Sequence, residues 1–245
     1  MVKRILQPFY AAYVVITFSV SVLAVFPFFV IISIGNNAAA RRAIYTIIKV
    51  WARGWFWVIG MPMTSVGKRP AKGKYVVVAN HISYLDTLVI FPALPGYFRA
   101  LGKKETSKIP VIGFIYRQLV IMVDRSSAKS RSMSMRLLWR VLHKEGNIII
   151  FPEGTFNETG EPLKEFYDGA FRLAINTKTQ ILPIIFPDTV DRWHYSAWWK
   201  LWPGRNRVVY LPAVDITGMT TDDVPELKQL VYATMEKAVM SYRGS

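Results

Sequence analysis

The first forty residues hold the feature that most limits how this chain can fold. No charged residue stands between Arg4 and Arg41, and the stretch from Ile5 to Ile34 is almost entirely apolar. About 20 apolar residues in a helix span the hydrocarbon core of a bilayer, so this stretch is long enough to cross one. It is also much longer than the apolar core of a cleaved signal peptide. We therefore predict a membrane-associated helical segment over residues 5–34.

The sequence leaves open two arrangements of this segment in the membrane. Pro27 lies inside it and is expected to kink the helix, because proline lacks a backbone donor and clashes with the preceding turn. The segment is then either one tilted span or a bent segment that enters and leaves the same leaflet. The alternative is a very hydrophobic helix in the core of the protein.

The stretch that follows, from Arg41 to Lys74, is strongly basic and has no acidic residue. Its first part, residues 41–60, carries apolar residues at helical spacing, namely Ile44, Ile47, Ile48, Trp51 and Trp55. This pattern predicts a basic amphipathic helix that lies on a membrane, or else a helix that packs on the rest of the domain. Basic flanks of membrane segments usually stay in the cytoplasm. We expect the remaining chain to face the cytoplasm from the inner membrane.

The overall composition supports a membrane partner. The formal charge of +15 calls for an anionic partner, and 52% of the residues are hydrophobic. This combination favours membrane lipids over nucleic acid, and we predict no nucleic-acid partner. The chain has no cysteine, which excludes disulfides and cysteine-based metal sites, and we predict no metal site.

From Tyr75 onward, short apolar runs alternate with helical patterns. Such alternation predicts an α/β fold with a largely parallel central sheet flanked by helices. We divide the chain into membrane-anchoring helices (1–74) and an α/β domain (75–245). Strands are expected at 75–80, 98–101, 119–123, 147–151, 181–186 and 208–211, and helices at 86–94, 108–119, 127–144, 166–176 and 224–242.

Polar clusters follow three of the predicted strands. His81 and Asp86 follow the first strand, Asp124 and Arg125 follow the third, and Glu153-Gly154-Thr155 follows the fourth. Ligands bind beyond the carboxyl ends of the strands in open α/β sheets, so these clusters should meet. Arg125 offers a planar, permanently charged fork that suits a phosphate.

His81 and Asp86 are candidates for a catalytic pair. A histidine takes up a proton near neutral pH, and a carboxylate fixes its tautomer and stabilises the imidazolium. In one helix, residues five positions apart diverge by roughly 140°, so the two side chains meet only if His81 precedes a helix that contains Asp86. Asn80 or Ser83 is expected to cap that helix. The alternative is a loop histidine and a solvent-exposed aspartate that do not meet.

Four sequence blocks resemble those of the glycerolipid acyltransferases, and most closely the bacterial 1-acyl-sn-glycerol-3-phosphate acyltransferases. The similarity covers roughly residues 50–215. The blocks stand in the family's order: Asn80-His81 to Asp86, Gly113 to Arg117 with Val123-Asp124-Arg125, Phe151-Pro152-Glu153-Gly154-Thr155, and Ile181-Leu182-Pro183-Ile184.

The resemblance implies that the chain moves an acyl group from acyl-CoA or acyl carrier protein to the sn-2 hydroxyl of a lysophospholipid. The product would be phosphatidate, and no bound cofactor is needed. By the same resemblance His81 is the general base and Asp86 orients it. Residues that bind the phosphate end of the acceptor are Arg125, Glu153, Gly154 and Thr155.

The third block departs from the family pattern. The family often has arginine after the Phe-Pro-Glu-Gly-Thr run, whereas this chain has Phe156 and Asn157. We expect Lys164, Arg125 or the Lys103-Lys104 pair to supply the missing cation. The departure leaves the identity of the lysolipid acceptor more open than the reaction itself.

Two other classes of function fit the sequence less well. A lipid hydrolase with a His/Asp pair needs a serine on a Gly-Xaa-Ser-Xaa-Gly elbow, and the chain has none. A membrane-anchored nucleic-acid-binding protein would leave the four ordered blocks unexplained. The aromatic stretch over residues 193–202 is predicted to rest at the membrane interface, to line an acyl channel, or to pack as a loop on the domain.

Overall fold

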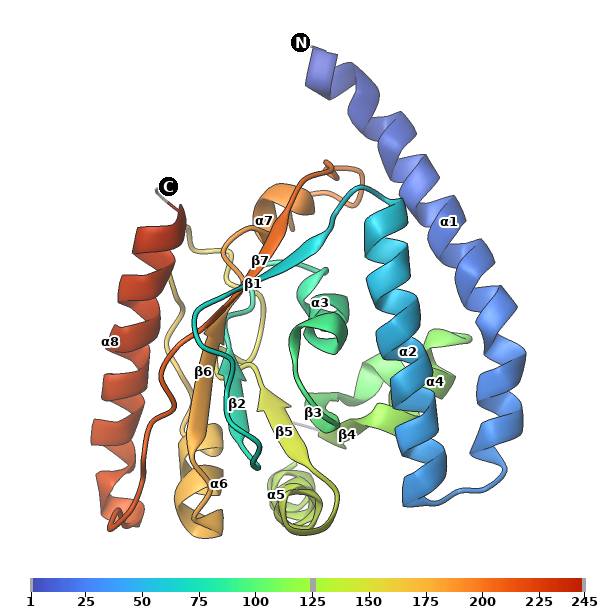
Figure 1. Cartoon of the computed structure of the whole chain (residues 1–245). Coiled ribbons are helices and arrows are strands. Elements are labelled where there is room, and N and C mark those ends of the chain that lie inside the picture. The colour runs from blue at the N-terminus through green and yellow to red at the C-terminus, as the bar shows by residue number, and fades with distance from the viewer. Residues whose placement is uncertain (1, 124–126, 244–245) are drawn as a thin grey trace.

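The computed structural model describes residues 2–123 and 127–243 and shows an α/β fold with a mostly parallel sheet (Figure 1). The sheet has seven strands in the order β1-β7-β6-β2-β5-β3-β4. Only the β6–β7 pair in this sheet is antiparallel. The fold predicted from the alternation of strands and helices is confirmed. The strands are β1 Met63–Val66, β2 Val76–Ala79, β3 Phe98–Lys103, β4 Val120–Val123, β5 Asn147–Ile150, β6 Ile181–Ile185 and β7 Asn206–Tyr210.

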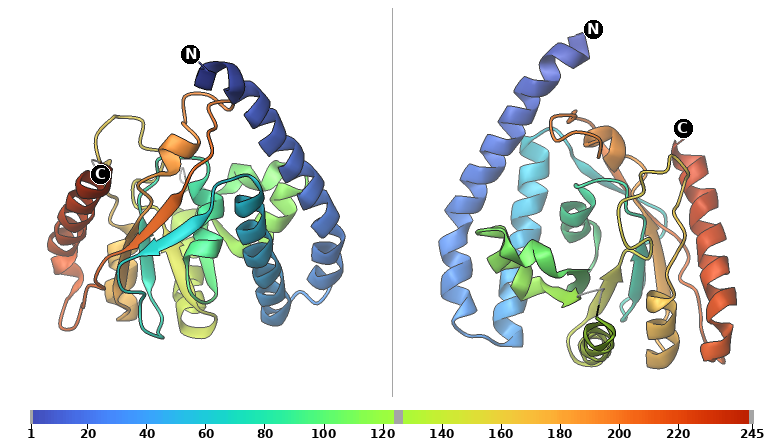
Figure 2. Two further views of the ribbon diagram at one scale, coloured as in Figure 1. Left: turned by 45° about the horizontal axis from the view of Figure 1, so that its top comes forward. Right: turned by 180° about the vertical axis from the view of Figure 1, so that it is seen from behind.

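Helices cover both faces of the sheet (Figures 1 and 2). One face carries α1 Val2–Ser33, α2 Ala38–Val58, α3 Asp86–Ala93 and α4 Ile112–Leu119, and the other carries α5 Ala128–Lys144, α6 Gly169–Thr177 and α8 Val224–Arg243. The short helix α7, Thr189–Arg192, follows β6 near the carboxyl ends of the parallel strands. Two 3-10 turns, η1 Lys104–Lys108 and η2 Thr221–Asp223, complete the described elements.

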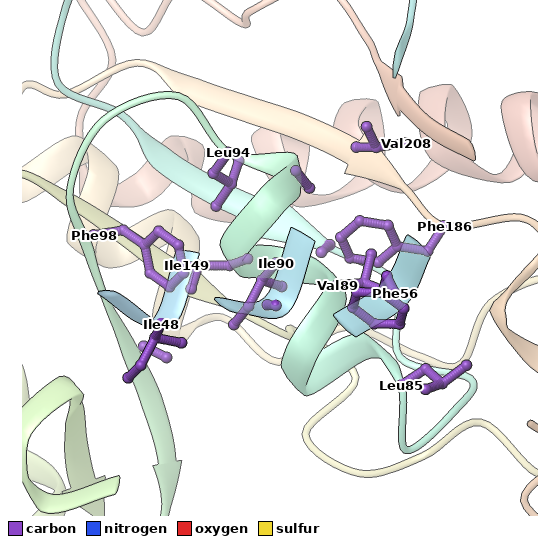
Figure 3. Close-up of a cluster of buried hydrophobic side chains, with 14 of the residues drawn as sticks. Ile48, Phe56, Leu85, Val89, Ile90, Leu94, Phe98, Ile149, Phe186 and Val208 are labelled. Carbon is purple, nitrogen blue, oxygen red and sulfur yellow. The ribbon is translucent and has the colours of Figure 1, made fainter. Parts of the chain in front are cut away.

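Strand β2 shows why its sequence reads as an unbroken apolar run. Val76 and Val78 point into the hydrophobic core beneath α5, α6 and α8, whereas Val77 and Ala79 point into the core beneath α2 and α3. A parallel strand that is covered on both faces needs an apolar residue at every position. Figure 3 shows the core on the α2 and α3 side, where Phe56, Val89 and Phe186 lie together.

The two N-terminal helices form a hairpin against this core (Figure 1). Phe18 of α1 packs edge-on against Trp51 and Trp55 of α2, with ring centroids 5.6 and 5.3 Å apart. The helix α1 continues through Pro27, so the expected kink does not interrupt it. Among the described elements, α1 is the helix long and apolar enough to cross a membrane, and much of its apolar surface is exposed.

Helix α2 and strand β1 join the N-terminal region to the rest of the chain. The apolar stripe of α2 is buried in the same core as α3, and β1 pairs with β7. Of the two predicted positions for this helix, on a membrane or packed on the domain, the structure shows the second for its apolar side. The functional division at residue 74 stays a prediction, as does the contact of α2 with a membrane.

Strand β1 and helix α7 were not expected from the sequence, and neither were the two 3-10 turns. Strand β1 has four residues and lies at the edge of the sheet, where it pairs with β7. It is too short and too little buried to need a long apolar run, which is the pattern that marks most of the other strands. Helix α7 has four residues, which is too short for a helical pattern to be visible. Helix α4 also begins later than predicted, at Ile112, because Lys104–Lys108 forms a 3-10 turn before it.

Candidate active site

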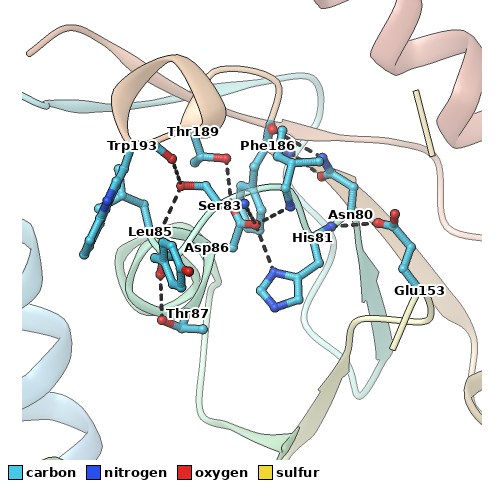
Figure 4. A network of polar contacts seen from close by, with 12 residues as sticks. Asn80, His81, Ser83, Leu85, Asp86, Thr87, Glu153, Phe186, Thr189 and Trp193 are labelled. Atoms are coloured by element: carbon cyan, nitrogen blue, oxygen red, sulfur yellow. Dashed lines mark hydrogen bonds and ion pairs between the residues drawn. The ribbon is translucent and has the colours of Figure 1, made fainter. Parts of the chain in front are cut away.

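The turn between β2 and α3 brings His81 and Asp86 together (Figure 4). His81 is the second residue after the end of β2, and Asp86 is the first residue of α3. Nδ1 of His81 lies 3.0 Å from Oδ2 of Asp86. The aspartate is completely buried, and the histidine side chain is 13% exposed. The arrangement is the one that the five-residue spacing requires.

Four donors converge on the Asp86 carboxylate. Oδ2 accepts hydrogen bonds from the backbone amides of Ile82 and Ser83, at 2.7 and 2.8 Å, in addition to the imidazole. Oδ1 accepts a hydrogen bond of 2.6 Å from the hydroxyl of Thr189 in α7. A carboxylate used only as an acceptor requires Nδ1 of His81 to carry the donated proton. Nε2 then holds a lone pair, and it has no hydrogen-bond partner in the part of the chain that the structure describes.

The turn between β2 and α3 carries the candidate catalytic pair, and we call it the catalytic turn. It is hydrogen-bonded to residues that directly follow β6 and α7. The side-chain amide of Asn80 accepts a hydrogen bond from the backbone N–H of Phe186 at 2.7 Å and donates one to its carbonyl at 3.3 Å. The Ser83 hydroxyl donates to the carbonyl of Trp193 at 2.7 Å and accepts from the amide of Leu85 at 3.2 Å. Neither Asn80 nor Ser83, the two residues expected to cap α3, does so, because the N-cap position is Leu85 and no side chain caps it. Asn80 instead lies between two strand ends.

Aromatic rings surround the imidazole. The ring of Phe151, directly after β5, stacks on His81 with centroids 4.2 Å apart, and Phe156 packs against it at 4.3 Å. Tyr84 meets Phe156 edge-on at 4.7 Å. Phe156 stands where the resembled family often has an arginine, so an apolar ring, and not a cation, borders the histidine here.

Glu153 ties the loop after β5 to the catalytic turn. Its carboxylate is completely buried, and its two oxygens accept hydrogen bonds from the backbone amides of His81 at 2.7 Å and Lys164 at 2.9 Å. Gly154 has φ +75°, a conformation that glycine adopts without strain, and so it suits the sharp turn that follows. The amide of Asn157 donates to the carbonyl of His81 at 2.7 Å.

The remaining predicted site residues lie around this centre. The ammonium group of Lys164 donates to the hydroxyl of Thr155 at 2.9 Å, so these two residues are brought together. Lys103 is exposed at the end of β3, which is separated from β2 by one strand, β5. Asp124 and Arg125 lie outside the described residues. Within residues 2–123 and 127–243, no group of three or more histidine or acidic side chains is arranged to hold a metal ion.

Sequence reasoning missed Thr189 and Trp193. Both come from the segment after β6, more than 100 positions away from the turn that they contact. The rule that ligand sites lie beyond strand ends applies to β6 as it does to β2 and β5. The available signal was Thr189, a hydroxyl residue four positions after the end of β6. The sequence does not show that its partner is Asp86.

Glu153 is expected to make stability depend on pH. Burial raises the pKa of its carboxyl group to about 7, against the opposing effect of the two backbone amides. Between the unfolded pKa near 4.5 and the folded pKa of about 7, Glu153 holds more proton in the native state than in the unfolded state. The free energy of unfolding therefore falls as the pH rises through this range. The loss amounts to about 3 kcal/mol, or roughly 6–12 °C in Tm.

The matched variant is Glu153→Gln, which does not titrate. We expect its Tm difference from the wild type to depend on pH, with the wild type losing more stability between pH 5 and pH 8. Thermal unfolding in detergent micelles at several pH values measures this difference. A constant difference across that range would show that Glu153 does not titrate there.

Comparison with known proteins places the chain among relatives of one kind. The model of the family described as Acyltransferase matches residues 63–187, which is half of the chain. The 1-acyl-sn-glycerol-3-phosphate acyltransferase alpha of Mus musculus is 33% identical over 168 residues, covering 68% of this chain and 59% of the mouse protein. The 1-acyl-sn-glycerol-3-phosphate acyltransferase of Borreliella burgdorferi is 29% identical over 136 residues, covering 54% of each chain. The chain thus spans about three fifths or less of the length of these curated relatives.

The fold also matches a solved structure over nearly its whole length. The crystal structure of the 1-acyl-sn-glycerophosphate (LPA) acyltransferase PlsC from Thermotoga maritima superposes with a TM-score of 0.82. The match covers 99% of this chain and 98% of that one, at 22% identity, and it establishes the fold. The family match spans the segment that contains His81, Asp86 and Glu153. This chain therefore belongs to the acyltransferase family.

Proposed function

We propose that the protein transfers a fatty acyl group from a thioester to the sn-2 hydroxyl of 1-acyl-sn-glycerol-3-phosphate, which yields phosphatidate. The donor is acyl-CoA or an acylated acyl carrier protein. The observation that carries this proposal is the orientation of His81, whose Nδ1 is bound to buried Asp86 while Nε2 is left as a base. The names of the relatives supply the acceptor.

The reaction follows from this geometry. Nε2 of His81 takes the proton of the acceptor hydroxyl as its oxygen attacks the thioester carbonyl. Asp86 stabilises the imidazolium that forms, since it is held by four hydrogen bonds and need not move. The tetrahedral intermediate then expels the thiolate, which takes the proton back from the imidazolium. Backbone amides near the strand ends are suited to stabilise the oxyanion.

We propose that cationic side chains near His81 bind the phosphate of the acceptor. Lys164 is held next to Thr155, and both lie on the loop that Glu153 fastens to the catalytic turn. We propose that Lys164, Thr155 and the backbone at Gly154 receive the phosphate, with Arg125 and Lys103 completing the charge. Glu153 supports this site through the backbone amides that it binds.

Replacing Lys164 with alanine is expected to raise the KM for lysophosphatidate about 10- to 150-fold, because a charge-assisted contact of about 1.5–3 kcal/mol is lost. The KM for the acyl donor should stay the same. Arg125→Ala should behave alike, and Lys164→Arg should retain most of the affinity. Steady-state kinetics with each substrate varied in turn measures this. A rise in donor KM alone would remove both residues from the acceptor site.

We further propose that the protein resides at the cytoplasmic membrane with the site facing the cytoplasm. The support is the apolar helix α1 and the basic stretch that follows it. Membrane lipids are then both the surroundings and the source of the acceptor.

A product assay tests the proposed function. Purified protein is incubated with acyl-CoA or acyl carrier protein and with a panel of lysolipids, and products are read by mass spectrometry. Formation of phosphatidate from lysophosphatidate is the expected result. Product from a different lysolipid alone would show that the acceptor is that lysolipid and not lysophosphatidate. One observation favours this second candidate function: Phe156 borders His81 where the family often has an arginine. Fatty acid release without transfer would indicate a hydrolase.

A further inference from the structure

The segment from Trp193 to Trp202, which we call the tryptophan loop, connects α7 to β7 and exposes two large aromatic side chains. Trp198 is 60% exposed and Trp199 is 46% exposed. Indole rings offer a large apolar surface with one polar N–H, so they gain free energy when they are buried at a partner. Two neighbouring exposed rings at a loop tip therefore indicate a contact surface.

Backbone hydrogen bonds within the loop position these rings. Trp193 and Leu201 form a β-bridge, and Leu201 is completely buried. The amide of His194 donates to the carbonyl of Lys200 at 3.1 Å, and the amide of Lys200 donates to the carbonyl of Ala197 at 3.1 Å. The base of the loop is thereby closed, and its tip is held away from the core.

The tryptophan loop lies between the catalytic turn and the start of the apolar helix. At one end, the Ser83 hydroxyl is bonded to the carbonyl of Trp193. At the other end, the ring of Trp202 lies 6.4 Å from that of Tyr10 and 5.5 Å from the ammonium group of Lys3, both in α1. Figures 1 and 2 show the segment between α7 and β7 at the end of the molecule where α1 begins.

The surroundings of the tryptophan loop add to its aromatic and basic character. Trp57, near the end of α2, is 76% exposed, and the carbonyl of Gly60 just after that helix accepts a hydrogen bond of 2.9 Å from the amide of Gly204. Lys200 and Arg205 are exposed, and no acidic residue occurs from position 193 to 205. Tryptophan together with lysine and arginine is typical of the headgroup level of a bilayer with anionic lipids.

We propose that the tryptophan loop is a second membrane contact, separate from α1, that docks at the headgroup level of a bilayer containing anionic phospholipid. Because Ser83 joins it to the catalytic turn, docking holds His81 close to the interface where a lysolipid acceptor lies. This inference rests on the proposed function, since the acceptor is taken to be a membrane lipid.

Fluorescence quenching by brominated lipid tests the contact in the full-length protein. The protein is reconstituted into vesicles of phosphatidylcholine and phosphatidylglycerol in which the phosphatidylcholine carries bromine near the headgroup end of its chains. Trp198→Phe/Trp199→Phe should lower the fraction of emission that is quenched, because it removes fluorophores at the interface. Trp139→Phe is the matched control, because Trp139 is 47% exposed on α5, away from the loop. This control should leave the quenched fraction unchanged or raise it.

The outcomes separate this inference from the proposed function. If the double variant leaves the quenched fraction unchanged or raises it, as the control does, the loop is not at the bilayer and the inference is wrong. If the wild type shows no quenching at all, the protein is not at the membrane, and the proposed location fails as well.

A kinetic measurement distinguishes membrane docking from a role in an acyl channel or in binding a protein partner. Trp198→Ala/Trp199→Ala should lower kcat/KM about tenfold for lysophosphatidate presented in vesicles, a loss of about 1.4 kcal/mol. It should leave kcat/KM unchanged for a short-chain, water-soluble lysophosphatidate. An equal loss with both acceptors would show that the loop binds substrate. No loss with either acceptor would show that the exposed rings contact something other than the membrane, such as a protein partner. Both results would overturn the proposal.

Discussion

Replacing His81 with alanine is expected to lower kcat by about 10³-fold, within the range usual for a positioned general base. The protein should stay folded, because the backbone groups of residue 81 make the contacts that hold the turn. Its amide binds Glu153, and its carbonyl accepts a hydrogen bond from Asn157. Alanine keeps both. Initial rates of acyl transfer, together with the thermal unfolding midpoint, measure the effect.

His143→Ala provides the control for this experiment. His143 is exposed on α5, where its ring stacks on Trp139 and Nδ1 lies 2.9 Å from the carbonyl of the same residue. Its side-chain contacts are with Trp139, and among the described residues none is with the candidate site, so its replacement should leave the rate unchanged. If His81→Ala kept more than about a tenth of the wild-type rate, His81 would not be the base.

Replacing Asp86 with asparagine is expected to lower kcat by about 10²–10³-fold with little loss of stability. An asparagine oxygen in place of Oδ2 can still accept from His81, Ile82 and Ser83, and its amide can donate to the hydroxyl of Thr189, which is able to reverse its role. The fold is thus preserved while the negative charge is removed. The imidazolium that forms during transfer then lacks its counter-charge.

Asp86→Ala separates the two roles of this residue. It leaves the buried donors around Asp86 without a partner, at about 1–3 kcal/mol each for those that stay unsatisfied. We therefore expect Asp86→Ala to lower Tm markedly and Asp86→Asn to lower it little, while both lose activity. An Asp86→Asn protein with a rate within a few-fold of the wild type would show that the charge does not assist transfer.

The sequence predicted the sheet and the catalytic turn well because both are local. An apolar run such as Val76–Ala79 follows from burial on both faces, and the reach between His81 and Asp86 follows from the geometry of one turn. The contacts that complete the site are not local. Thr189, Phe186 and Trp193 reach the turn from more than 100 positions away, so no spacing rule reveals them.

Two further features show where sequence patterns are ambiguous. The stripe that includes Ile44, Ile48 and Trp55 is the same whether a helix lies on a membrane or on a domain, and the structure buries it in the domain core. The resemblance to the acyltransferases implied that Glu153 helps to bind the acceptor phosphate. The structure shows a buried carboxylate that binds two backbone amides, and any role towards the acceptor phosphate stays a prediction.

The most direct test of the central claim is a structure of the protein with lysophosphatidate bound. We predict that the sn-2 hydroxyl oxygen lies about 2.6–3.2 Å from Nε2 of His81, the reach that a general base requires. The phosphate should lie against Lys164 and Thr155. A hydroxyl held away from Nε2, with the phosphate far from Lys164, would contradict the assignment of His81 as the base and of this loop as the acceptor site.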